Sequence, residues 1–339
     1  MRLIGSTSMP AASDVAAGII NPVTGRWMTK SWQFDQLLPE AEATYRAIEE
    51  AFDISIYHPI PEIRFCQNSD DLKRLGRRMR NPRYQNVLGE AYAPGEDAAE
   101  FKNCEGSFSI SQAAYVDLPL LVATIREEFS KQGILQDEAF IHSKLQRDES
   151  HWEYGAIRAD KVIFCEGAAA RSNPWFSELA LKPVKGETLL CQSPSLKLAP
   201  MLYHHKKWFL PYPDGSFRIG ATYDASDLSE LPTEAQKEKL LTAAREALKE
   251  SHEIQVTDHL AGIRPSSSDS RPIVGPHPSE SGLYILNGLG SKGASTAPSM
   301  TRQLTEHILQ NRPLDPEVDL ARFKADTLGN DTTTRSHAG

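Results

Sequence analysis

The sequence predicts an α/β fold, α+β overall, in which two domains are interleaved along the chain. Short apolar runs typical of buried strands alternate with helical patterns at both ends and in the middle of the chain. Between them, residues 185–223 contain several short strands separated by turns, which is typical of an antiparallel sheet. A length of 339 residues accommodates two domains. We therefore expect a parallel-sheet domain and an antiparallel-sheet domain, each built from separate segments.

The N-terminal part carries one strong helical pattern and several strand-like runs. Leu37, Ala41, Tyr45 and Ile48 recur at helical spacing and predict an amphipathic helix over 32–51. The other elements expected here are a strand fragment at 2–4, a strand broken by two prolines at 54–65, a basic exposed helix at 70–79, a strand at 107–116 and a helix at 118–129.

The C-terminal part predicts both kinds of sheet. Strands are expected at 140–145 and 161–167, and the second ends in a glycine, as a buried parallel strand beside a ligand often does. Thr233 with Gln236 has the pattern of a capping box, so a helix is expected to begin there. The short antiparallel strands are expected at 188–191, 208–210 and 217–220, with a turn at 213–215.

The stretch 283–295 joins an apolar run to three glycines and then to a helical pattern. A strand, a glycine-rich turn and a helix N-terminus together present backbone N–H groups and a positive dipole end to an anion. Gly288, Gly290 and Gly293 spell G-x-G-x-x-G, but no second parallel strand follows, as the dinucleotide fingerprint requires. We interpret the stretch as a loop that covers a cofactor. An ordinary glycine-rich turn explains these residues equally well when they are taken alone.

Small residues also dominate the segment 11–22 near the N-terminus. Such residues allow another group to approach the backbone closely. Ser13 is a candidate N-cap for a short helix through Ala17, which would leave N–H groups facing a phosphate. A tightly packed junction between a helix and a strand is the alternative.

Composition and charge exclude several classes of function. The net charge of −8 makes nucleic acid an unlikely partner, although it does not exclude a local basic patch. Four scattered cysteines without a C-x-x-C indicate a reducing compartment, and no signal peptide or membrane-spanning run is visible, so we expect a cytoplasmic protein. The adjacent His204 and His205 would point to opposite faces of a strand, so no metal site is predicted.

Four segments together resemble D-amino acid oxidase and its relatives. Residues 13–18 resemble the phosphate-side segment of that family, and 162–168 resemble its strand ending in a glycine. Residues 262–265 resemble the segment with its substrate-carboxylate arginine, and 288–295 resemble the loop over the flavin ring. The resemblance implies an FAD/NAD(P)-binding Rossmann-like domain interleaved with an antiparallel-sheet substrate domain.

The resemblance also implies domain boundaries. The FAD-binding domain, incomplete at its N-terminus, would comprise 1–52, 135–184 and 260–325. The substrate or cap domain would comprise 53–134 and 185–259, and residues 326–339 would form a flexible tail.

The family motifs imply a set of site residues when they are carried over position by position. Arg264 would be the catalytic residue that holds a substrate carboxylate, and Trp208 and Tyr203 would line the substrate pocket, although ordinary sheet packing explains each aromatic residue as well. Lys292 would add positive charge beside the reduced flavin or would lie in solvent. The residues implied to bind FAD are Ala12, Ser13, Ala17, Gly18, Ile19, Gly167, Gly288, Gly290, Ser291, Lys292, Gly293, Ala294 and Ser295.

One departure from the family pattern concerns the N-terminus. The family begins with a strand, a G-x-G-x-x-G turn and a helix, about 25–30 residues of that kind, and none is recognisable here. Gly5 stands where an acidic residue would hold the ribose. A truncated gene model, a unit supplied by another chain and a relative that has lost FAD are three explanations. We favour truncation because the other flavin-facing segments are present.

The resemblance implies oxidation of a C–N bond in an amino acid or secondary amine, with hydride transfer to FAD. Two alternatives stay open. The segment 290–298 is also similar to the flavin domain of the bifunctional tRNA 5-methylaminomethyl-2-thiouridine enzyme, which oxidises a glycine-like group on a tRNA base. The other alternative is a non-catalytic remnant without flavin. The expected partner is a small-molecule amine or amino acid, and the sequence does not indicate an oligomeric state.

Overall fold

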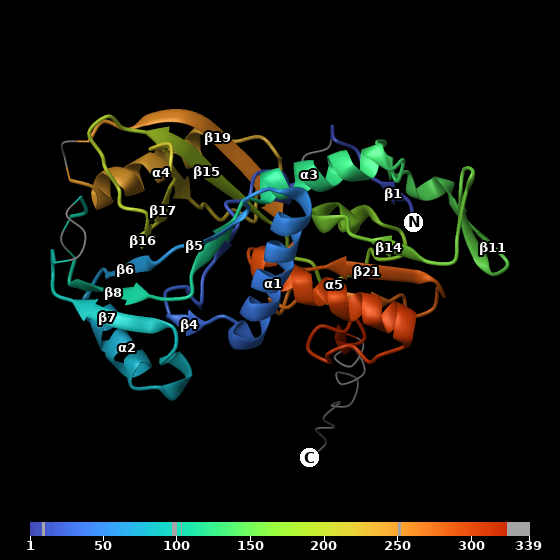
Figure 1. The fold of residues 1–339 in the computed structure, drawn as a ribbon, viewed down its shortest axis with the longest axis horizontal. Helices are drawn as coiled ribbons and strands as arrows, with labels where there is room; N and C mark the ends of the chain where they lie inside the picture. Colours follow the sequence, from blue (N-terminus) through green and yellow to red (C-terminus); the bar gives the residue numbers. More distant parts are fainter. Residues whose placement is uncertain (9–10, 97–99, 103, 250–251, 324–339) are drawn as a thin grey trace, which may run out of the picture. The chain divides into compact units, whose positions relative to one another are not determined.

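The computed structural model describes residues 1–8, 11–96, 100–102, 104–249 and 252–323, and it divides into two compact units (Figure 1). Unit 1 comprises Met1–Met9, Phe129–Val184 and Arg264–Gly339, and unit 2 comprises Pro10–Glu128 and Lys185–Ile263. The α/β class and the interleaving of the two parts are confirmed. The tail predicted at 326–339 lies outside the described residues.

The largest difference from the predicted boundaries is that residues 10–52 belong to unit 2; residues 129–134 belong to unit 1 and 260–263 to unit 2. The physical reason is pairing within that unit: β2 (Ile19–Ile20) pairs antiparallel with β9 (Ala114–Val116), and helix α1 (Phe34–Phe52) packs against β5 (Tyr57–Pro59). The functions assigned to the two predicted domains stay predictions.

Unit 1 contains a short mixed sheet covered by the last long helix. Strand β14 (Val162–Phe164) pairs in parallel with β21 (Leu283–Asn287), which pairs antiparallel with β20 (Ile273–Pro276). Helix α5 (Gly293–Gln310) packs against β20 and β21 and runs along β21 in Figure 1. The smaller sheets are the parallel pair β1 (Leu3–Ile4) and β10 (Leu135–Gln136), and the antiparallel β11 (Leu145–Asp148), β12 (His151–Tyr154) and β13 (Ile157–Ala159).

The strand predicted at 140–145 is wrong. A 3-10 turn, η3 (His142–Lys144), occupies this segment, and β11 begins only at Leu145. Local side-chain packing explains the turn: the Phe140 ring stacks on Tyr154 with centroids 4.6 Å apart, and His142 Nε2 lies 2.6 Å from Glu166 Oε1. These contacts stabilise a compact backbone in preference to an extended one.

Unit 2 is built on an eight-stranded sheet with the order β19-β15-β18-β17-β16-β6-β8-β7. Strands β15 to β18 pair antiparallel with their neighbours, whereas β16 pairs in parallel with β6. The strand bounds are β6 (Glu62–Cys66), β7 (Leu88–Tyr92), β8 (Gly106–Ile110), β15 (Val184–Gln192), β16 (Leu202–His204), β17 (Trp208–Pro211), β18 (Phe217–Gly220) and β19 (Gln255–Arg264).

The remaining helices are close to their predicted bounds. Helix α1 buries Leu37, Ala41 and Tyr45, which confirms the apolar stripe read from the sequence. Helices α2 (Ser69–Met79), α3 (Leu118–Lys131) and α4 (Glu234–Ala247) also lie where helices were expected. Among the described residues, no helix has both the length and the apolar character needed to cross a membrane.

The capping box predicted at the start of α4 is wrong. Thr233 occupies the N-cap position but makes no side-chain capping bond. Its hydroxyl and its backbone N–H donate instead to the two carboxylate oxygens of Glu187, at 3.2 and 2.9 Å. The buried Glu187 carboxylate on β15 therefore accepts the Thr233 N–H, which a capping box would have paired with the Gln236 side chain.

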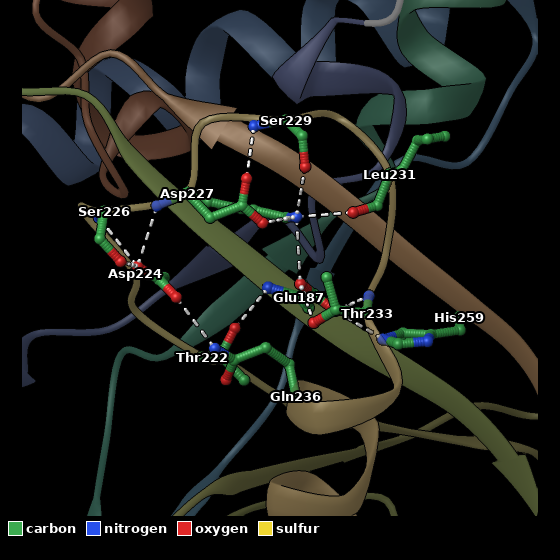
Figure 2. Close-up of polar contacts among 11 residues, drawn as sticks. Glu187, Thr222, Asp224, Ser226, Asp227, Ser229, Leu231, Thr233, Gln236 and His259 are labelled. Atoms are coloured by element: carbon green, nitrogen blue, oxygen red, sulfur yellow. Dashed lines mark hydrogen bonds and ion pairs between the residues drawn. The ribbon is translucent and has the colours of Figure 1, made fainter.

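Glu187 belongs to a buried polar network around Lys185 on β15 (Figure 2). The Lys185 side chain is 1% exposed, and its Nζ donates to Asp227 Oδ2 at 2.6 Å, to Ser229 Oγ at 3.0 Å and to the Leu231 carbonyl at 2.6 Å. Glu187 Oε1 lies 3.4 Å from the same nitrogen. The network holds the loop between β18 and α4 against β15.

The network also sets how one carboxylate responds to pH. The hydrogen bond from Lys185 lowers the pKa of Asp227 to about 2, below the ordinary value of about 3.9. A lowered pKa means that the ionised form stabilises the folded state above the ordinary pKa. That contribution is lost as the pH falls through the folded-state value.

We expect Lys185→Met to lower the free energy of unfolding by about 3–5 kcal/mol, because Glu187 is left buried without its cation. Urea unfolding measures the change. Lys206→Met is the matched control, since Lys206 pairs with Glu246 at 2.9 Å with both side chains about half exposed. The control should cost less than about 1 kcal/mol. Equal costs for the two variants would contradict a structural role for the network.

Candidate functional site

Residues far apart in the sequence meet at the end of β21 in unit 1. Asn287, the last residue of β21, donates through Nδ2 to the Gly167 carbonyl at 2.9 Å. Its Oδ1 accepts the Gly288 N–H at 2.8 Å. The Gly290 N–H donates to the Pro265 carbonyl at 3.2 Å. The structure therefore brings three predicted segments together, those of Gly167, Arg264-Pro265 and the glycine-rich turn.

The glycines of this site fall into two groups. Gly288 and Gly290 have φ values of +71° and +55°. A Cβ at Gly288 would lie 2.9 Å from Ile273 Cγ1, and one at Gly290 would lie 3.3 Å from Ser266 Oγ. These two glycines are needed for the packing of the turn against its own unit.

The other two glycines have room for a Cβ at ordinary contact distance. Gly167 has a φ of +55°, and the nearest atom to a Cβ there would be Pro265 Cγ at 4.0 Å. At Gly293 the nearest atom would be Leu289 Cβ at 3.6 Å, an ordinary contact distance. No protein atom therefore crowds the Cβ position at Gly167 or Gly293.

The start of α5 offers fewer free amides than the sequence suggests. Lys292 is the N-cap residue, and its carbonyl accepts the N–H groups of Ser295 and Thr296 at 3.1 and 3.0 Å. The hydroxyls of both residues donate to the same carbonyl. Among the described residues, the Gly293 N–H has no protein acceptor, and it lies at the positive end of an 18-residue helix.

The charges around this turn favour an anion. Burial, together with the nearby Arg271, lowers the pKa of Lys292 from its ordinary value. In the part of the chain that the structure describes, no carboxylate lies within ion-pair distance of Lys292. Ser291 is exposed, whereas Ala294 and Ser295 are buried in the first turn of α5. Gly293 and Lys292 thus present positive charge at the start of α5.

The predicted site residues near the N-terminus lie in unit 2, in a different local structure. Ala12 and Ser13 belong to a 3-10 turn, η1 (Ala12–Asp14), whose N-cap is Ala11. Ser13 is therefore not the cap, and the turn ends before Ala17. Asp14 supports Ala11 in the N-cap position, because its carboxylate accepts the Ala11 N–H at 3.1 Å.

Gly18 is small because the protein itself approaches it. Its φ is +62°, and a Cβ there would lie 1.9 Å from the Val116 carbonyl oxygen on β9. The tightly packed junction that the sequence left open is therefore present at this position. Ala17 and Ile19 pack in an apolar cluster with Trp208 around Ile60, Leu202 and Leu210.

The two aromatic residues predicted to contact substrate have different surroundings. Tyr203 is 4% exposed and stacks on Phe101 with centroids 4.8 Å apart, so it is a core residue of unit 2. Trp208 is partly buried and packs across β18, where its Cζ2 would lie 2.3 Å from a Cβ at Gly220. Core packing accounts for Tyr203, and we do not assign it a substrate contact.

Sequence reasoning missed two buried polar residues that shape these segments. Asn287 ends an apolar strand immediately before a glycine, and that position was a usable signal. Arg218 lies within the apolar strand β18, donates to the Val15 carbonyl and donates to Thr188 Oγ1 at 2.9 Å. An arginine within an apolar run points to a buried acceptor, but the acceptor lies about 200 residues away in the sequence.

Other reactive side chains do not converge on this site. His204 Nδ1 lies 3.5 Å from Glu62 Oε1, and His205 Nε2 lies 3.0 Å from Cys104 Sγ. Burial lowers the pKa of His205 to about 4, so a neutral imidazole faces the thiol. Among the residues that the structure describes, no group of three His, Cys, Asp or Glu side chains is placed to hold a metal ion.

A cavity of about 530 Å³ also lies in unit 1, but none of the predicted site residues lines it. Its walls are formed by Arg2, Leu135, Gln136, Ala156, Ile157 and Arg158.

Comparison with known families decides the class. The model of the FAD-dependent oxidoreductases, DAO, matches residues 4–307. This chain belongs to that family. Family membership confirms the resemblance carried by the four sequence segments, and the family depends on FAD.

The most similar proteins include enzymes of two kinds. A glycine oxidase of Pseudomonas aeruginosa is 33% identical over 165 residues, which are 48% of this chain and 45% of the relative. The tRNA 5-methylaminomethyl-2-thiouridine biosynthesis bifunctional protein of Marinobacter nauticus is 33% identical over 193 residues, 51% of this chain and 30% of that protein. The matched part of the chain thus spans about half the length of the first relative and less of the second.

Comparison with solved structures shows a similar fold over the whole of this chain. The crystal structure of glycine oxidase from Geobacillus kaustophilus superposes with a TM-score of 0.77 at 21% identity, and the match covers 100% of this chain and 93% of that one. The shared fold includes both units.

Proposed function

We propose that this FAD-dependent oxidoreductase oxidises the C–N bond of a small amino acid or amine. The observation that supports the proposal best is the meeting of Gly167, the glycine-rich turn and the start of α5 in a chain of this family. When bound, FAD supplies the hydride acceptor. The residues of this chain bind it, orient the substrate and exclude water.

Lys292 and Gly293 would stabilise negative charge on the flavin ring. The Gly293 N–H, the positive end of the α5 dipole and Lys292 all lie at the N-terminus of the helix. The pKa of Lys292 is lowered by burial and by Arg271. An anion bound nearby would raise that pKa again, because opposite charge favours the protonated amine. The lysine would therefore become a better partner once the anion is present.

Arg264 would hold the substrate carboxylate. It ends β19 and immediately precedes Pro265, whose carbonyl accepts the Gly290 N–H. The arginine is thereby tied to the turn that we propose covers the flavin. A guanidinium group matches a carboxylate in two parallel hydrogen bonds, which fixes orientation as well as affinity.

Oxidation of an amine carried on tRNA is the second candidate. It is supported by the 33% identity to the bifunctional tRNA-modifying protein over 193 residues. The chemistry at the C–N bond would be the same, and the substrate would differ only in the molecule to which the amine is attached.

The function is tested by adding FAD to the purified full chain and following visible absorbance. We expect the protein to retain oxidised flavin through gel filtration. Under anaerobic conditions, we expect glycine or a secondary amino acid to bleach the visible absorbance of the flavin. A folded protein that stays colourless would support the non-catalytic remnant instead.

Gly293→Asp separates the proposed flavin contact from helix stability. A carboxylate in the first turn favours the helix by about 0.3–1 kcal/mol, but it repels an anionic ring. We expect unchanged or higher stability and roughly ten-fold weaker binding of reduced FAD relative to oxidised FAD, measured as a lower midpoint potential of the bound flavin, since only the reduced ring is anionic. Gly293→Asn, which has the same shape without the charge, should keep a midpoint potential close to that of the wild type. An equal fall in potential in both variants would exclude the electrostatic role.

Arg264→Lys should raise KM for amino acids about 10–100-fold, since one of two charge-assisted bonds is lost. The flavin spectrum should not change. Amines without a carboxylate should keep their kinetics, and Arg158→Lys on exposed β13 serves as the control variant. A uniform loss with both substrate classes would show that Arg264 acts on the fold and not on the carboxylate.

A further inference from the structure

Unit 2 carries a surface whose charge is opposite to that of the whole chain. The chain has a net charge of −8, yet residues 69–83 contain six basic and two acidic side chains. They form α2 and the 3-10 turn η2 (Pro82–Tyr84). Arg26 adds a further positive charge from the turn between β3 (Val23–Thr24) and β4 (Thr29–Lys30). We call these elements together the arginine surface.

Most of the exposed cations on this surface lack an acidic partner. Lys73 pairs with Asp70 at 3.1 Å, and Arg74 pairs with Asp71 at 2.6 Å, which uses both acidic residues. Four further arginines are exposed, and in the described part of the chain none of them has a carboxylate within ion-pair distance. They are Arg26, Arg77, Arg80 and Arg83.

Neighbouring positive charges without acidic partners repel one another and so destabilise α2. Arg77 on α2 and Arg80 at its C-cap follow the paired Lys73 at i+4 and i+7, so the three cations lie on one side of the helix. Like charges at this spacing weaken a helix. By contrast, unit 2 satisfies its buried cation Lys185 with two carboxylates. An anion from outside the chain would offset the repulsion on α2.

Contacts with Trp27 and with backbone carbonyls of the β3–β4 turn fix the position of the arginine surface. Trp27 is 56% exposed, with the Arg26 and Arg74 guanidinium groups 4.8 and 5.0 Å from its ring centroid. Arg78 donates to the Trp27 carbonyl at 3.1 Å. The buried Arg64 donates to the Gly25 carbonyl at 2.6 Å, which fixes the β3–β4 turn. Arg74 and Arg78 each keep a buried Nε atom without a hydrogen-bond partner.

The composition of the surface favours RNA over other anions. Six of the seven basic residues are arginines, whose planar fork binds phosphate in two bonds, whereas lysine acts as a point charge. The exposed indole and guanidinium planes can also stack on unpaired bases. Helix α2 has 11 residues and is about 16 Å long, enough to follow several phosphates.

We propose that the arginine surface binds RNA, and that tRNA is its ligand. The proposal deepens the second candidate function and rests on it for the identity of the RNA. Binding itself is measured without turnover, so it stands or fails separately from the flavin chemistry. The surface would hold the body of the tRNA through its phosphates, in addition to any contact made by the modified base.

The test uses the full chain and fluorescently labelled bulk tRNA over a series of salt concentrations. One variant combines Arg26→Gln, Arg77→Gln, Arg80→Gln and Arg83→Gln. A matched control removes four exposed cations from other parts of unit 2, with Lys206→Gln, Lys239→Gln, Arg245→Gln and Lys249→Gln. Far-ultraviolet circular dichroism and the unfolding midpoint establish that both variants fold.

We expect the plot of log Kd against log salt to flatten in the arginine variant by about three units, since each phosphate contact contributes about 0.7–0.9. The control should change the slope by less than about one. Flavin bleaching by free glycine should be unchanged in both variants, which separates this proposal from the oxidase reaction.

Three outcomes would overturn the proposal. The first is an absence of tRNA binding, and the second is equal loss of binding in the two variants. The third is equally tight, arginine-dependent binding of polyglutamate or of vesicles containing phosphatidylserine. That result would assign the surface to an acidic protein or to a membrane.

Discussion

The side chain of Asn287 fixes the geometry on which the candidate site depends. It is 2% exposed, so its amide must find partners within the protein. The nitrogen binds the carbonyl of Gly167, which follows β14 and begins the 3-10 turn η4 (Gly167–Ser172), and the oxygen binds the Gly288 N–H at the start of the glycine-rich turn. One residue therefore aligns the ends of two parallel strands and sets the direction in which the chain enters α5. The placement of Gly293 and Lys292 follows from that alignment.

Charge is used in two different ways in unit 2. Where a cation is buried, as at Lys185, the loop before α4 supplies a carboxylate, a hydroxyl and a carbonyl, and Glu187 on the same strand supplies a second carboxylate. Such a network is needed because an unpaired buried charge is strongly destabilising. On α2 the exposed arginines are not matched in this way, although the chain as a whole is acidic. The difference indicates that the charge of α2 is directed outward.

The sequence anticipated those features that depend on local pattern. The helix at 34–52, the strand at 283–287 and the glycine-rich turn after it follow from periodicity and from glycine placement. The cap predicted at Ser13 was wrong, because η1 begins earlier, with Ala11 at the N-cap position and Asp14 accepting its N–H. Thr233 does occupy the N-cap of α4, but the predicted capping box fails because Glu187, on a distant strand, accepts the Thr233 hydroxyl. Likewise, the acceptor for Arg218 could not be read from the sequence around it.

The predicted glycines show why a small residue alone does not identify a ligand site. At Gly18 and Gly288 the space of the missing Cβ is filled by Val116 and by Ile273, so protein packing explains both. At Gly167 and Gly293 the nearest protein atoms lie at ordinary contact distance, so packing against a neighbour does not account for the missing side chain. Gly293 in addition has an N–H without a protein acceptor among the described residues and lies beside Lys292. The case for a flavin contact therefore depends on the start of α5, which combines an uncrowded glycine, a helix dipole and a cation without a nearby carboxylate.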